Sequence, residues 1–399
     1  MRSWTGAIAG FGRSASGRRT GTAAARDAAR RRLPRAVFDF VDGGADDESA
    51  LRRNRAAFEA IELLPRVLVG TQRRDRSIEL FGRTWSAPFA IGPTGLAGMV
   101  RPGAEPMLAK AAARAGIPFT LSVLACATIE EVAACGNGPK WFQLYVLRDR
   151  GLTHALAARA LAAGYEALVV TADAPVVGRR ERDGRNDFSI PMRITVRNAA
   201  DILSRPGWLI DALRAGPPIP VNLLDAAGGR AGVRSLAQFA AEQLDPMVNW
   251  DDIAELRRLW PRTFLVKGVL AEEDVRRAIA IGADGVIASN HGGRQLDSAP
   301  APITRLPLLA EAAAGKIALL CDSGFRRGSD VIKALALGAD GVLLGRAPLY
   351  GVAADGEDGA LEVLDAIGAE IDTVLALLGC HTIGEVGRQH LAAAADASV

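Results

Sequence analysis

Short apolar segments alternate with longer, alanine-rich segments between about residues 88 and 347. The apolar segments are rich in aliphatic side chains, as buried strands are, and the segments between them have helical spacing. Near-continuous apolar strands separated by helices predict parallel strands joined by helical crossovers. Eight such strand–helix units favour a closed (β/α)8 barrel, the TIM-barrel fold, over an open α/β sheet. The expected strands are Pro88–Gly95, Ile117–Val123, Trp141–Leu147, Ala167–Asp173, Thr263–Val269, Gly285–His291, Ile317–Gly324 and Gly341–Ala347.

Two stretches of the expected barrel repeat the same local pattern. AIAIGADGVIASN at Ala278–Asn290 recurs as ALALGADGVLLGR at Ala334–Arg346. In each, a helix ends at a glycine, which adopts positive φ at little cost, and a short turn leads into an apolar strand. The repetition supports a fold in which one strand–helix unit is used several times.

The expected barrel lies within a single domain that we place at residues 26–380. Residues 1–25 are rich in Gly, Ser and Arg and predict a disordered basic tail, with an organelle-targeting peptide as the alternative. Residues 26–87 predict an N-terminal segment of two helices and an antiparallel flap. Residues 190–250 form a long, proline-containing insertion after the fourth strand, which in a compact domain is usually functional or mobile. Residues 381–399 are expected to be a C-terminal tail.

Composition narrows the classes of function. Hydrophobic residues make up 49% of the 399 residues and aromatic residues only 5%, so the core must consist mainly of Ala, Val, Ile and Leu. The net charge of +3 is too small to indicate a nucleic-acid partner. The four cysteines show no CxxC spacing, and the first residues contain no apolar run long enough for a secretory signal or a membrane span. We therefore expect a cytoplasmic protein without a metal site.

Polar residues gather where the expected strands end. In (β/α)8 enzymes the chemistry takes place at the carboxyl ends of the strands. Any one of these residues could be only a cap or a turn, but polar groups at the ends of all eight strands together indicate a site. They are Pro93-Thr94-Gly95, Ser122, Gln143, Tyr145, Thr171, Asp173, Lys267, Ser289, His291, Asp322, Arg326, Gly345 and Arg346.

A phosphate site is predicted after the seventh and eighth strands. The string DSGFRRGS at Asp322–Ser329 follows the seventh strand and opens the helix DVIKALALG. Backbone N–H groups at a helix N-terminus, assisted by a guanidinium group, bind anions. Gly345-Arg346 adds a second Gly-Arg pair after the eighth strand, where barrels commonly hold phosphate. The alternative is a solvated arginine pair beside a helix cap.

His291 lies in the string SNHGGRQLD and is the only histidine of four at an expected strand end. A histidine there can exchange a proton near neutral pH, and the two glycines that follow allow the backbone to approach a ligand closely. Arg294 in the same string could hold a carboxylate. Arg180, in the string RRERD after the fourth strand, is a second candidate clamp, because a planar guanidinium binds a carboxylate through two hydrogen bonds. The alternative for RRERD is a solvated charged face.

The strings SNHGGRQLD, DSGFRRGSD, WFQLYV, GPTG and LVKG occur together and in order. With them, the chain resembles the FMN-dependent α-hydroxy acid oxidase and dehydrogenase family, which includes glycolate oxidase, L-lactate dehydrogenase and mandelate dehydrogenase. The resemblance extends from about Arg32 to Gly379 and is greatest for the (S)-mandelate dehydrogenase branch. It implies FMN as the cofactor and a small-molecule 2-hydroxy acid as the substrate.

The resemblance also implies roles for individual residues. The proton acceptor falls on His291, and the carboxylate that stabilises the protonated histidine falls on Asp173. Arg180 and Arg294 are implied to bind the substrate carboxylate, and Tyr145, a further catalytic residue, to hydrogen-bond the substrate. Lys267 is implied to stabilise the negative charge of reduced flavin. Contacts to FMN are implied for Pro93, Thr94, Gly95, Ser122, Gln143, Thr171, Lys267, Ser289, Asp322, Ser323, Gly324, Phe325, Arg326, Gly345 and Arg346.

The implied reaction is oxidation of an (S)-2-hydroxy acid to the 2-keto acid, with the flavin taking two electrons. His291 would remove a proton from Cα in a carbanion scheme or from the hydroxyl in a hydride scheme, and the sequence leaves both open. The electron acceptor, whether oxygen, a quinone or a protein, is equally open. The family resemblance implies a homotetramer.

Three positions bear on the substrate. Phe40 stands where the family has a tyrosine whose hydroxyl reaches the substrate carboxylate. Three interpretations of this phenylalanine are open. The enzyme is a weaker catalyst on small hydroxy acids, or its substrate is larger and more apolar, or the two arginines compensate for the missing hydroxyl. Gly95, where relatives with smaller substrates carry Ala, and Leu124, where some carry Trp, leave space beside the flavin and favour an aryl or branched substrate. An FMN-dependent tailoring oxidase or isomerase that acts on a larger biosynthetic substrate is the alternative.

The insertion at residues 190–250 lies where the mandelate dehydrogenase-like relatives carry a membrane-associating segment. Interfacial helices combine an apolar face with basic flanks, so peripheral membrane contact on the cytoplasmic side is one hypothesis and an active-site lid is the other. The candidate apolar face consists of Trp208, Leu209, Ile210 and Leu213, flanked by Arg205 and Arg214.

Overall fold

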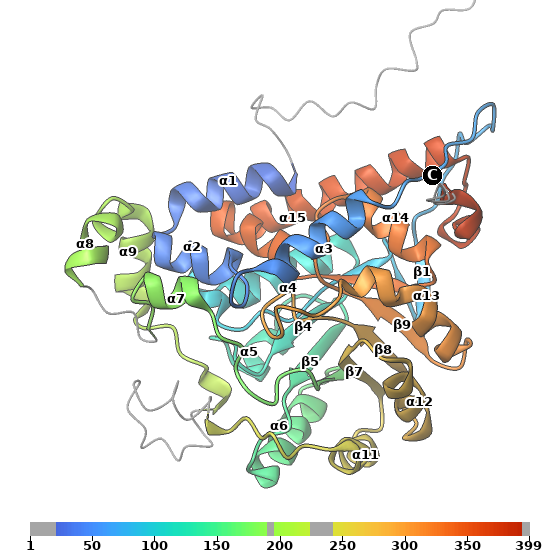
Figure 1. Cartoon of the computed structure of the whole chain (residues 1–399). Coiled ribbons are helices and arrows are strands. Elements are labelled where there is room, and N and C mark those ends of the chain that lie inside the picture. Colours follow the sequence, from blue (N-terminus) through green and yellow to red (C-terminus); the bar gives the residue numbers. More distant parts are fainter. Residues whose placement is uncertain (1–20, 190–194, 224–241, 393–399) are drawn as a thin grey trace, which may run out of the picture.

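A closed barrel of parallel strands forms the centre of the molecule (Figure 1). The computed structural model describes residues 21–189, 195–223 and 242–392. Each barrel strand lies within one of the expected segments, except that β5 begins one residue earlier, at Lys140. Strand β10 pairs with β3 to close the ring, so the predicted (β/α)8 barrel is confirmed. The barrel strands are β3 (Phe89–Ile91), β4 (Phe119–Ser122), β5 (Lys140–Leu144), β6 (Ala167–Thr171), β7 (Thr263–Val269), β8 (Gly285–Ala288), β9 (Ala318–Cys321) and β10 (Gly341–Leu344).

Burial on both faces explains why these strands are almost wholly apolar. Alternate side chains point into the barrel and fill it as a packed core, and the others pack against the surrounding helices. The inward-facing set consists mainly of Ala90, Trp141, Ala167, Val169, Leu265, Ile287, Leu320 and Leu343. The antiparallel hairpin of β1 (Ile78–Leu80) and β2 (Arg83–Trp85) closes the N-terminal end of the barrel, where the Trp85 ring lies 5.4 Å from that of Trp141.

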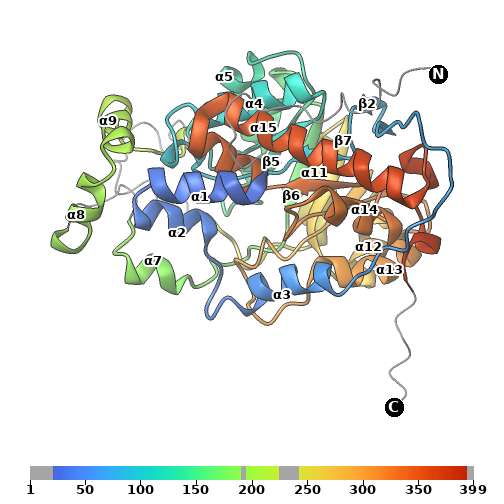
Figure 2. The same ribbon diagram turned by 90° about the horizontal axis from the view of Figure 1, so that it is seen from above.

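Helices follow the strands and surround the barrel (Figures 1 and 2). The two repeated stretches are α12 with β8 and α14 with β10, and the glycine after each helix has the expected positive φ, 77° at Gly282 and 103° at Gly338. The long α15 contains a break at Asp355 and Gly356. These helices are η1 (Ala97–Met99), α4 (Ala104–Ala115), α5 (Ile129–Ala133), α6 (Arg150–Ala162), α11 (Trp250–Leu259), α12 (Glu272–Ala280), α13 (Pro302–Ala313), α14 (Gly328–Ala336) and α15 (Arg346–Leu378).

The segment before the barrel contains three helices, where two were expected. They are α1 (Thr22–Arg32), α2 (Arg35–Asp42) and α3 (Ser49–Glu59). Pro34 separates α1 from α2, because proline lacks the N–H that a continuous helix would need and disfavours helical geometry in the residue before it. Helix α1 already includes residues 22–25 of the expected tail, and residues 1–20 lie outside the described part of the chain.

The expected C-terminal tail is packed against the domain as far as residue 392. It contains η3 (Ile383–Glu385) and η4 (Arg388–His390), and Leu391 forms a β-bridge with Leu63. Burial of His390, whose Nε2 lies 3.3 Å from the sulfur of Cys380, holds this segment in place. The described part of the expected tail, residues 381–392, is therefore ordered against the domain.

The long connection from β6 to β7 contains helices α7 (Glu181–Arg185), α8 (Val196–Leu203), α9 (Pro206–Ala215) and η2 (Val221–Leu223). Residues 190–194 and 224–241 of the expected insertion lie outside the described ranges. Trp208 does not belong to the expected exposed apolar face, because it is buried and its indole N–H donates to the carbonyl of Met99. Within the described ranges, no helix has the length and apolar character needed to cross a membrane.

Candidate active site

A cavity of about 330 Å³ opens at the carboxyl ends of the barrel strands. It is lined by every residue for which the sequence predicted a role except Asp173 and Ser289, which contact lining residues from behind. The predicted residues that line it are Phe40, Pro93, Thr94, Gly95, Ser122, Gln143, Tyr145, Thr171, Arg180, Lys267, His291, Arg294, Asp322, Ser323, Gly324, Phe325, Arg326, Gly345 and Arg346. Residues spread over more than 300 positions of the chain therefore meet in one place.

His291 and Asp173 form a hydrogen-bonded pair at the edge of this cavity. The Nδ1 of His291 lies 2.9 Å from Oδ1 of Asp173, which leaves Nε2 available to a ligand. His291 has a φ of 59°, a conformation that non-glycine residues seldom adopt and that is typical of functional sites. Its backbone N–H donates to the Ser289 hydroxyl at 3.0 Å. The histidine is therefore held from both its ring and its backbone.

Tight packing fixes the Asp173 carboxylate. Gly268, at a φ of 105°, lies so close that a Cβ at this position would be 2.5 Å from the Cβ of Asp173. Only glycine fits both this conformation and this contact. Burial acts to raise the pKa of Asp173, but its interactions with His291 and with the cation of Lys267 outweigh the effect of burial, and the pKa lies below its ordinary value. The carboxyl group is therefore ionised at neutral pH.

Lys267 is a buried cation at the end of β7, where the pairing of β7 with β8 is irregular between Lys267 and Val269. Its Nζ donates to the Ser289 hydroxyl at 2.8 Å and lies 3.1 Å from the carboxylate of Asp322. Burial acts to lower the pKa of Lys267, but Asp322 and Asp173 outweigh it and raise the pKa above its ordinary value. Lys267 thus presents a fixed positive charge to the cavity.

Neighbouring strands supply polar atoms that have no partner within the described part of the protein. The amide nitrogen of Gln143 and the hydroxyl of Thr171 are buried without a hydrogen bond, although both residues line the cavity. Ser122 donates its hydroxyl to the carbonyl oxygen of Gln143 at 2.9 Å, which turns the Gln143 amide N–H groups toward a remaining acceptor. A buried polar group without a partner costs about 1–3 kcal/mol, so these atoms indicate a polar ligand.

Arginine side chains make the opposite side of the cavity strongly cationic. Arg294 donates to the carbonyls of Phe40 at 2.7 Å and Gly43 at 3.0 Å. Burial, together with the nearby charges of Arg180 and Arg346, lowers the pKa of Arg294 well below its ordinary value. The nearest carboxylate to Arg180 is that of Asp183, at 3.8 Å. Like charges held together in a buried cavity favour the binding of an anion.

The second pair of arginines lies near the Ser323–Gly324 turn. Arg346 donates to the carbonyls of Val41, Gly43 and Gly292 at 2.7, 2.8 and 2.9 Å, so its guanidinium is held in one orientation. Arg326 lies with its guanidinium 5.7 Å from the centre of the Tyr350 ring, and burial lowers its pKa. Arg326 follows β9 and Arg346 follows β10, so both line the part of the cavity for which a phosphate site was expected.

Phe40 projects from α2 into the cavity. Its ring is stacked on that of Phe188, with centroids 4.6 Å apart and planes 11° from parallel. The guanidinium carbons of Arg180 and Arg294 lie 5.7 and 5.2 Å from the Phe40 centroid, within the range of cation–π attraction. Burial and the charge of Asp173 raise the pKa of Tyr145 to about 12, so its hydroxyl remains protonated and can donate.

Apolar side chains form one wall of the cavity, and of these only Leu124 was identified from the sequence. The wall comes from loops that follow several different strands and from the long insertion, and no local pattern distinguishes such residues from ordinary core. The wall consists of Leu124, Leu147, Val176, Val177, Pro220, Leu223 and Leu244.

Gln295 is a further residue that was not identified from the sequence. It connects the loops by donating to the carbonyls of Asp173 and Val176 and by accepting from the Gly178 N–H.

Comparison with known proteins places this site in a family. A family described as FMN-dependent dehydrogenase matches residues 29–393. The (S)-mandelate dehydrogenase of Pseudomonas putida is 45% identical over 90% of this chain and 91% of its own length. An L-lactate dehydrogenase of Stenotrophomonas maltophilia is 42% identical over 92% of this chain and 97% of its own.

Solved structures agree with the sequence comparison. The crystal structure of a monotopic membrane protein, (S)-mandelate dehydrogenase, superimposes with a TM-score of 0.90 at 43% identity and covers 94% of this chain and 99% of that one. A mandelate oxidase variant with (S)-mandelic acid gives a TM-score of 0.80 at 35% identity, over 94% of this chain and 98% of that one. The chain therefore belongs to the FMN-dependent dehydrogenase family and is an oxidoreductase with FMN as its cofactor.

Proposed function

We propose that this enzyme oxidises (S)-2-hydroxy acids with a bulky, mandelate-like side chain to the 2-keto acids. The observation that carries the proposal is the juxtaposition, in one cavity, of the His291–Asp173 pair with two buried arginines. An acid–base group and a carboxylate clamp are the two elements that this reaction requires of the protein. The 2-hydroxy acid dehydrogenases among the relatives support the same chemistry.

Binding of the substrate carboxylate falls to Arg180, Arg294 and Tyr145. Arg180 has a buried Nε without a partner in the described residues, and Tyr145 keeps its proton. A carboxylate between the two guanidinium groups would satisfy Arg180 and offset the mutual repulsion of the arginines. Selectivity for an anion thus follows from charges that the cavity leaves uncompensated.

His291 acts as the base. Asp173 accepts a hydrogen bond from Nδ1, which keeps Nε2 free to take a proton from the substrate and stabilises the imidazolium that results. The substrate gives up two electrons and two protons, of which His291 takes one, from Cα or from the hydroxyl. The chemistry that bound FMN would supply is uptake of the two electrons together with the other proton.

The cavity has the polar groups that FMN needs. Gln143 and Thr171 offer unsatisfied groups to the polar edge of a flavin, and Lys267 offers a positive charge that favours its reduced form. Arg326 and Arg346 supply the charge for the phosphate, beside the turn at Ser323–Gly324. The remaining proposed contacts are Pro93, Thr94, Gly95, Ser122, Ser289, Asp322, Phe325 and Gly345.

The apolar wall and Gly95 support a bulky side chain. A Cβ at position 95 would lie 3.1 Å from the Cβ of Leu124, so an alanine there would narrow the cavity from that side. Exposed Val176 and Val177 extend the apolar surface toward the mouth. Burial of an aryl ring against such a wall stabilises binding by about 25 cal/mol per Å² of apolar surface.

Phe40 supports a second candidate, an FMN-dependent tailoring oxidase or isomerase that acts on a larger substrate. The Phe40 ring fills a place at the carboxylate site without contributing a hydrogen-bonding group. A substrate without a free carboxylate would suit that change. The two candidates differ in whether simple (S)-2-hydroxy acids bleach the flavin.

A stopped-flow screen tests the proposal. Purified holoenzyme is mixed anaerobically with (S)-mandelate, (R)-mandelate, L-lactate and glycolate, flavin absorbance is followed, and reoxidation in air is then measured. We expect (S)-mandelate to bleach the flavin fastest, and an H291A variant to retain FMN but lose turnover by about 10²–10⁴-fold. Bleaching by none of the acids, or normal bleaching in H291A, would contradict the proposal.

We also propose that α8 and α9 contact a membrane surface. Both helices project from the side of the barrel (Figures 1 and 2). Val196, Leu203 and Leu213 on them are 98%, 69% and 75% exposed, and Arg197, Arg205 and Arg214 flank them. Vesicles containing phosphatidylglycerol should sediment the enzyme but leave an L203S/L213S variant in solution. Equal partitioning of the two proteins would contradict membrane contact.

A further inference from the structure

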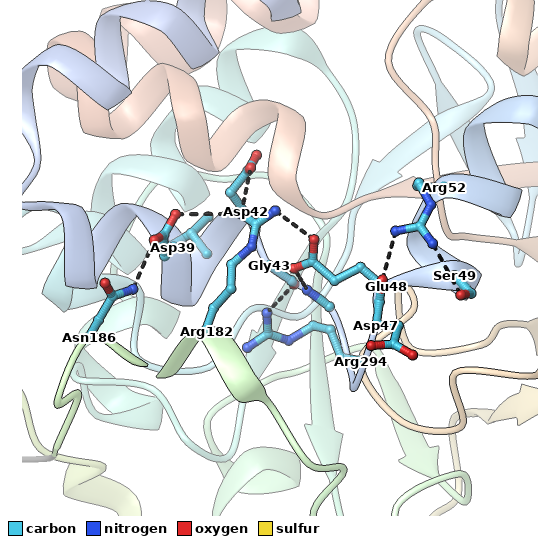
Figure 3. Close-up of polar contacts among 12 residues, drawn as sticks. Asp39, Asp42, Gly43, Asp47, Glu48, Ser49, Arg52, Arg182, Asn186 and Arg294 are labelled. Atoms are coloured by element: carbon cyan, nitrogen blue, oxygen red, sulfur yellow. Dashed lines mark hydrogen bonds and ion pairs between the residues drawn. The ribbon is translucent and has the colours of Figure 1, made fainter. Parts of the chain in front are cut away.

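Arg182, two residues after the proposed substrate arginine Arg180, reaches across to the N-terminal segment (Figure 3). One of its terminal nitrogens lies 2.5 Å from the carboxylate of Glu48. The other lies 3.4 Å from Asp39 and 3.5 Å from Asp42. A single guanidinium in α7 is thus shared by three carboxylates that belong to α2 and to the connection between α2 and α3.

The same N-terminal segment holds Arg294. The carbonyls of Phe40 and Gly43 accept hydrogen bonds from one terminal nitrogen of Arg294, so this guanidinium is oriented by the end of α2. The connection itself is fixed, because Glu48 accepts from the Gly44 N–H at 3.0 Å and Ala45 donates to the carbonyl of Gly293 at 2.8 Å. The end of α2 and the connection after it therefore contact both Arg294 and the segment that carries Arg180.

Within the described residues, the Arg180 side chain contacts α2 only through the cation–π contact with Phe40, at 5.7 Å, and the carbonyl of the preceding Arg179 accepts a hydrogen bond from the Asp46 N–H at 2.9 Å. Arg180 is the residue before the first turn of α7, and the nearest carboxylate is that of Asp183 at 3.8 Å. The further contacts of α7 and the residues after it with α2 come from Arg182, from Asn186, which donates to Asp39 at 2.8 Å, and from the stacking of Phe188 on Phe40. The position of Arg180 relative to Arg294 thus depends on how α7 is tied to α2.

Charge makes Arg182 the strongest of these ties. The side chains of Asp39, Asp42 and Glu48 are 14%, 9% and 14% exposed, so their attraction for the guanidinium is only partly screened by water. Burial acts to lower the pKa of Arg182, but Glu48 and the two aspartates outweigh it and raise the pKa. Phe188 makes an apolar contact and Asn186 donates an uncharged N–H to one carboxylate, whereas Arg182 brings a full positive charge to three carboxylates.

We propose that Arg182 is a positioning residue that fixes Arg180 relative to Arg294, so that both guanidinium groups meet one carboxylate. This inference rests on the proposed oxidation of a 2-hydroxy acid. It assigns to Arg182 no contact with the substrate and no part in proton transfer. Its effect is to pre-organise the carboxylate clamp, so that substrate binding does not have to order α7.

The test compares an anionic ligand with a neutral ligand of the same shape. Phenylacetate and phenylacetamide are titrated into holoenzyme, and binding is followed through the change in flavin absorbance. We expect R182M to weaken phenylacetate about tenfold, as expected when a hydrogen bond to a charged group is lost, and to leave phenylacetamide unchanged. KM for the hydroxy acid should rise by a similar factor, with a smaller change in kcat.

Matched variants complete the test. R179M removes a neighbouring, exposed arginine whose ion-pair partner is Glu181, and should bind phenylacetate as the wild type does. R182K should recover part of the loss, because lysine keeps the charge but cannot bridge several carboxylates. E48Q weakens the tie from the other side without altering α7, and should lower phenylacetate affinity even if R182M folds poorly.

A double-mutant cycle separates positioning from general stabilisation. If Arg182 acts through Arg180, then adding R182M to an R180M variant should cost no further phenylacetate affinity. Additive losses in that cycle, equal losses for phenylacetate and phenylacetamide, or no loss in R182M and E48Q would each overturn the inference. Its failure differs from failure of the proposed function, in which the wild-type enzyme itself oxidises no hydroxy acid.

Discussion

Replacing Asp173 with Asn removes the negative charge beside His291 and keeps the shape of the side chain. The two residues are joined by a 2.9 Å hydrogen bond, and their side chains are 13% and 23% exposed. In the wild-type enzyme the carboxylate can only accept from Nδ1, which leaves Nε2 as the basic nitrogen. An asparagine at the same place can turn its amide and donate to Nδ1, which puts the ring proton on Nε2 and blocks the base.

The structure gives the expected size of this effect. A hydrogen bond to a charged group contributes about 1.5–3 kcal/mol, which corresponds to roughly ten- to a hundredfold in rate when it is present in the transition state. Solvent screening is weak because both side chains are largely buried. The wrong ring tautomer adds to this loss, so we expect flavin reduction in D173N to be at least about a hundredfold slower than in the wild type.

Anaerobic stopped-flow reduction by saturating (S)-mandelate measures this step. The FMN content of D173N should equal that of the wild type, because Asp173 lies behind the cavity wall. Since the pKa of Asp173 lies below its ordinary value, the difference between the two proteins should persist throughout the neutral pH range. A D173N variant that carries FMN and is reduced at the wild-type rate would refute the role of the pair.

Two further predictions concern the substrate site and acid stability. F40Y restores a hydroxyl between the two arginines without disturbing the stack on Phe188, and we expect KM for (S)-mandelate to fall about tenfold; an unchanged KM in steady-state assays would show that the arginines alone hold the carboxylate. Burial acts to raise the pKa of Asp42, but hydrogen bonds from Arg26 and Tyr350, each at 2.7 Å, lower it from 3.8 to about 2. Because the pKa of Asp42 is lower in the folded than in the unfolded state, ionised Asp42 stabilises the folded state at any pH above the unfolded pKa. This contribution to the free energy of unfolding is about 2 kcal/mol, and it is lost as the pH falls toward the folded pKa. Urea unfolding should therefore show D42N to be less stable than the wild type by about this amount at pH 7, with the difference shrinking between pH 4 and pH 2; a constant difference over that range would contradict the assignment.

Local sequence patterns predicted the parts of this molecule that local physics decides. Strands β4, β6, β8, β9 and β10 each follow a helix and a glycine with positive φ, and every barrel strand is an apolar run. Strand burial and positive φ impose residue types that are visible one segment at a time. Errors arose where the decision was not local. Burial of His390 holds the C-terminal segment against the domain, although that segment has no strong pattern of its own. The break between α1 and α2 at Pro34, by contrast, is a local signal that the expectation of two helices overlooked.

The sequence by itself determined the barrel, the FMN family and the identity of the polar residues at its rim, including His291. Only the tertiary structure decided how those residues are held. Gly268 packs against Asp173 from the next strand, Arg182 reaches carboxylates more than 130 positions away, and Trp208 turns inward to Met99. The physical reason is that a rim residue is recognisable by its place at a strand end, whereas its orientation depends on contacts between segments that only the closed barrel brings together.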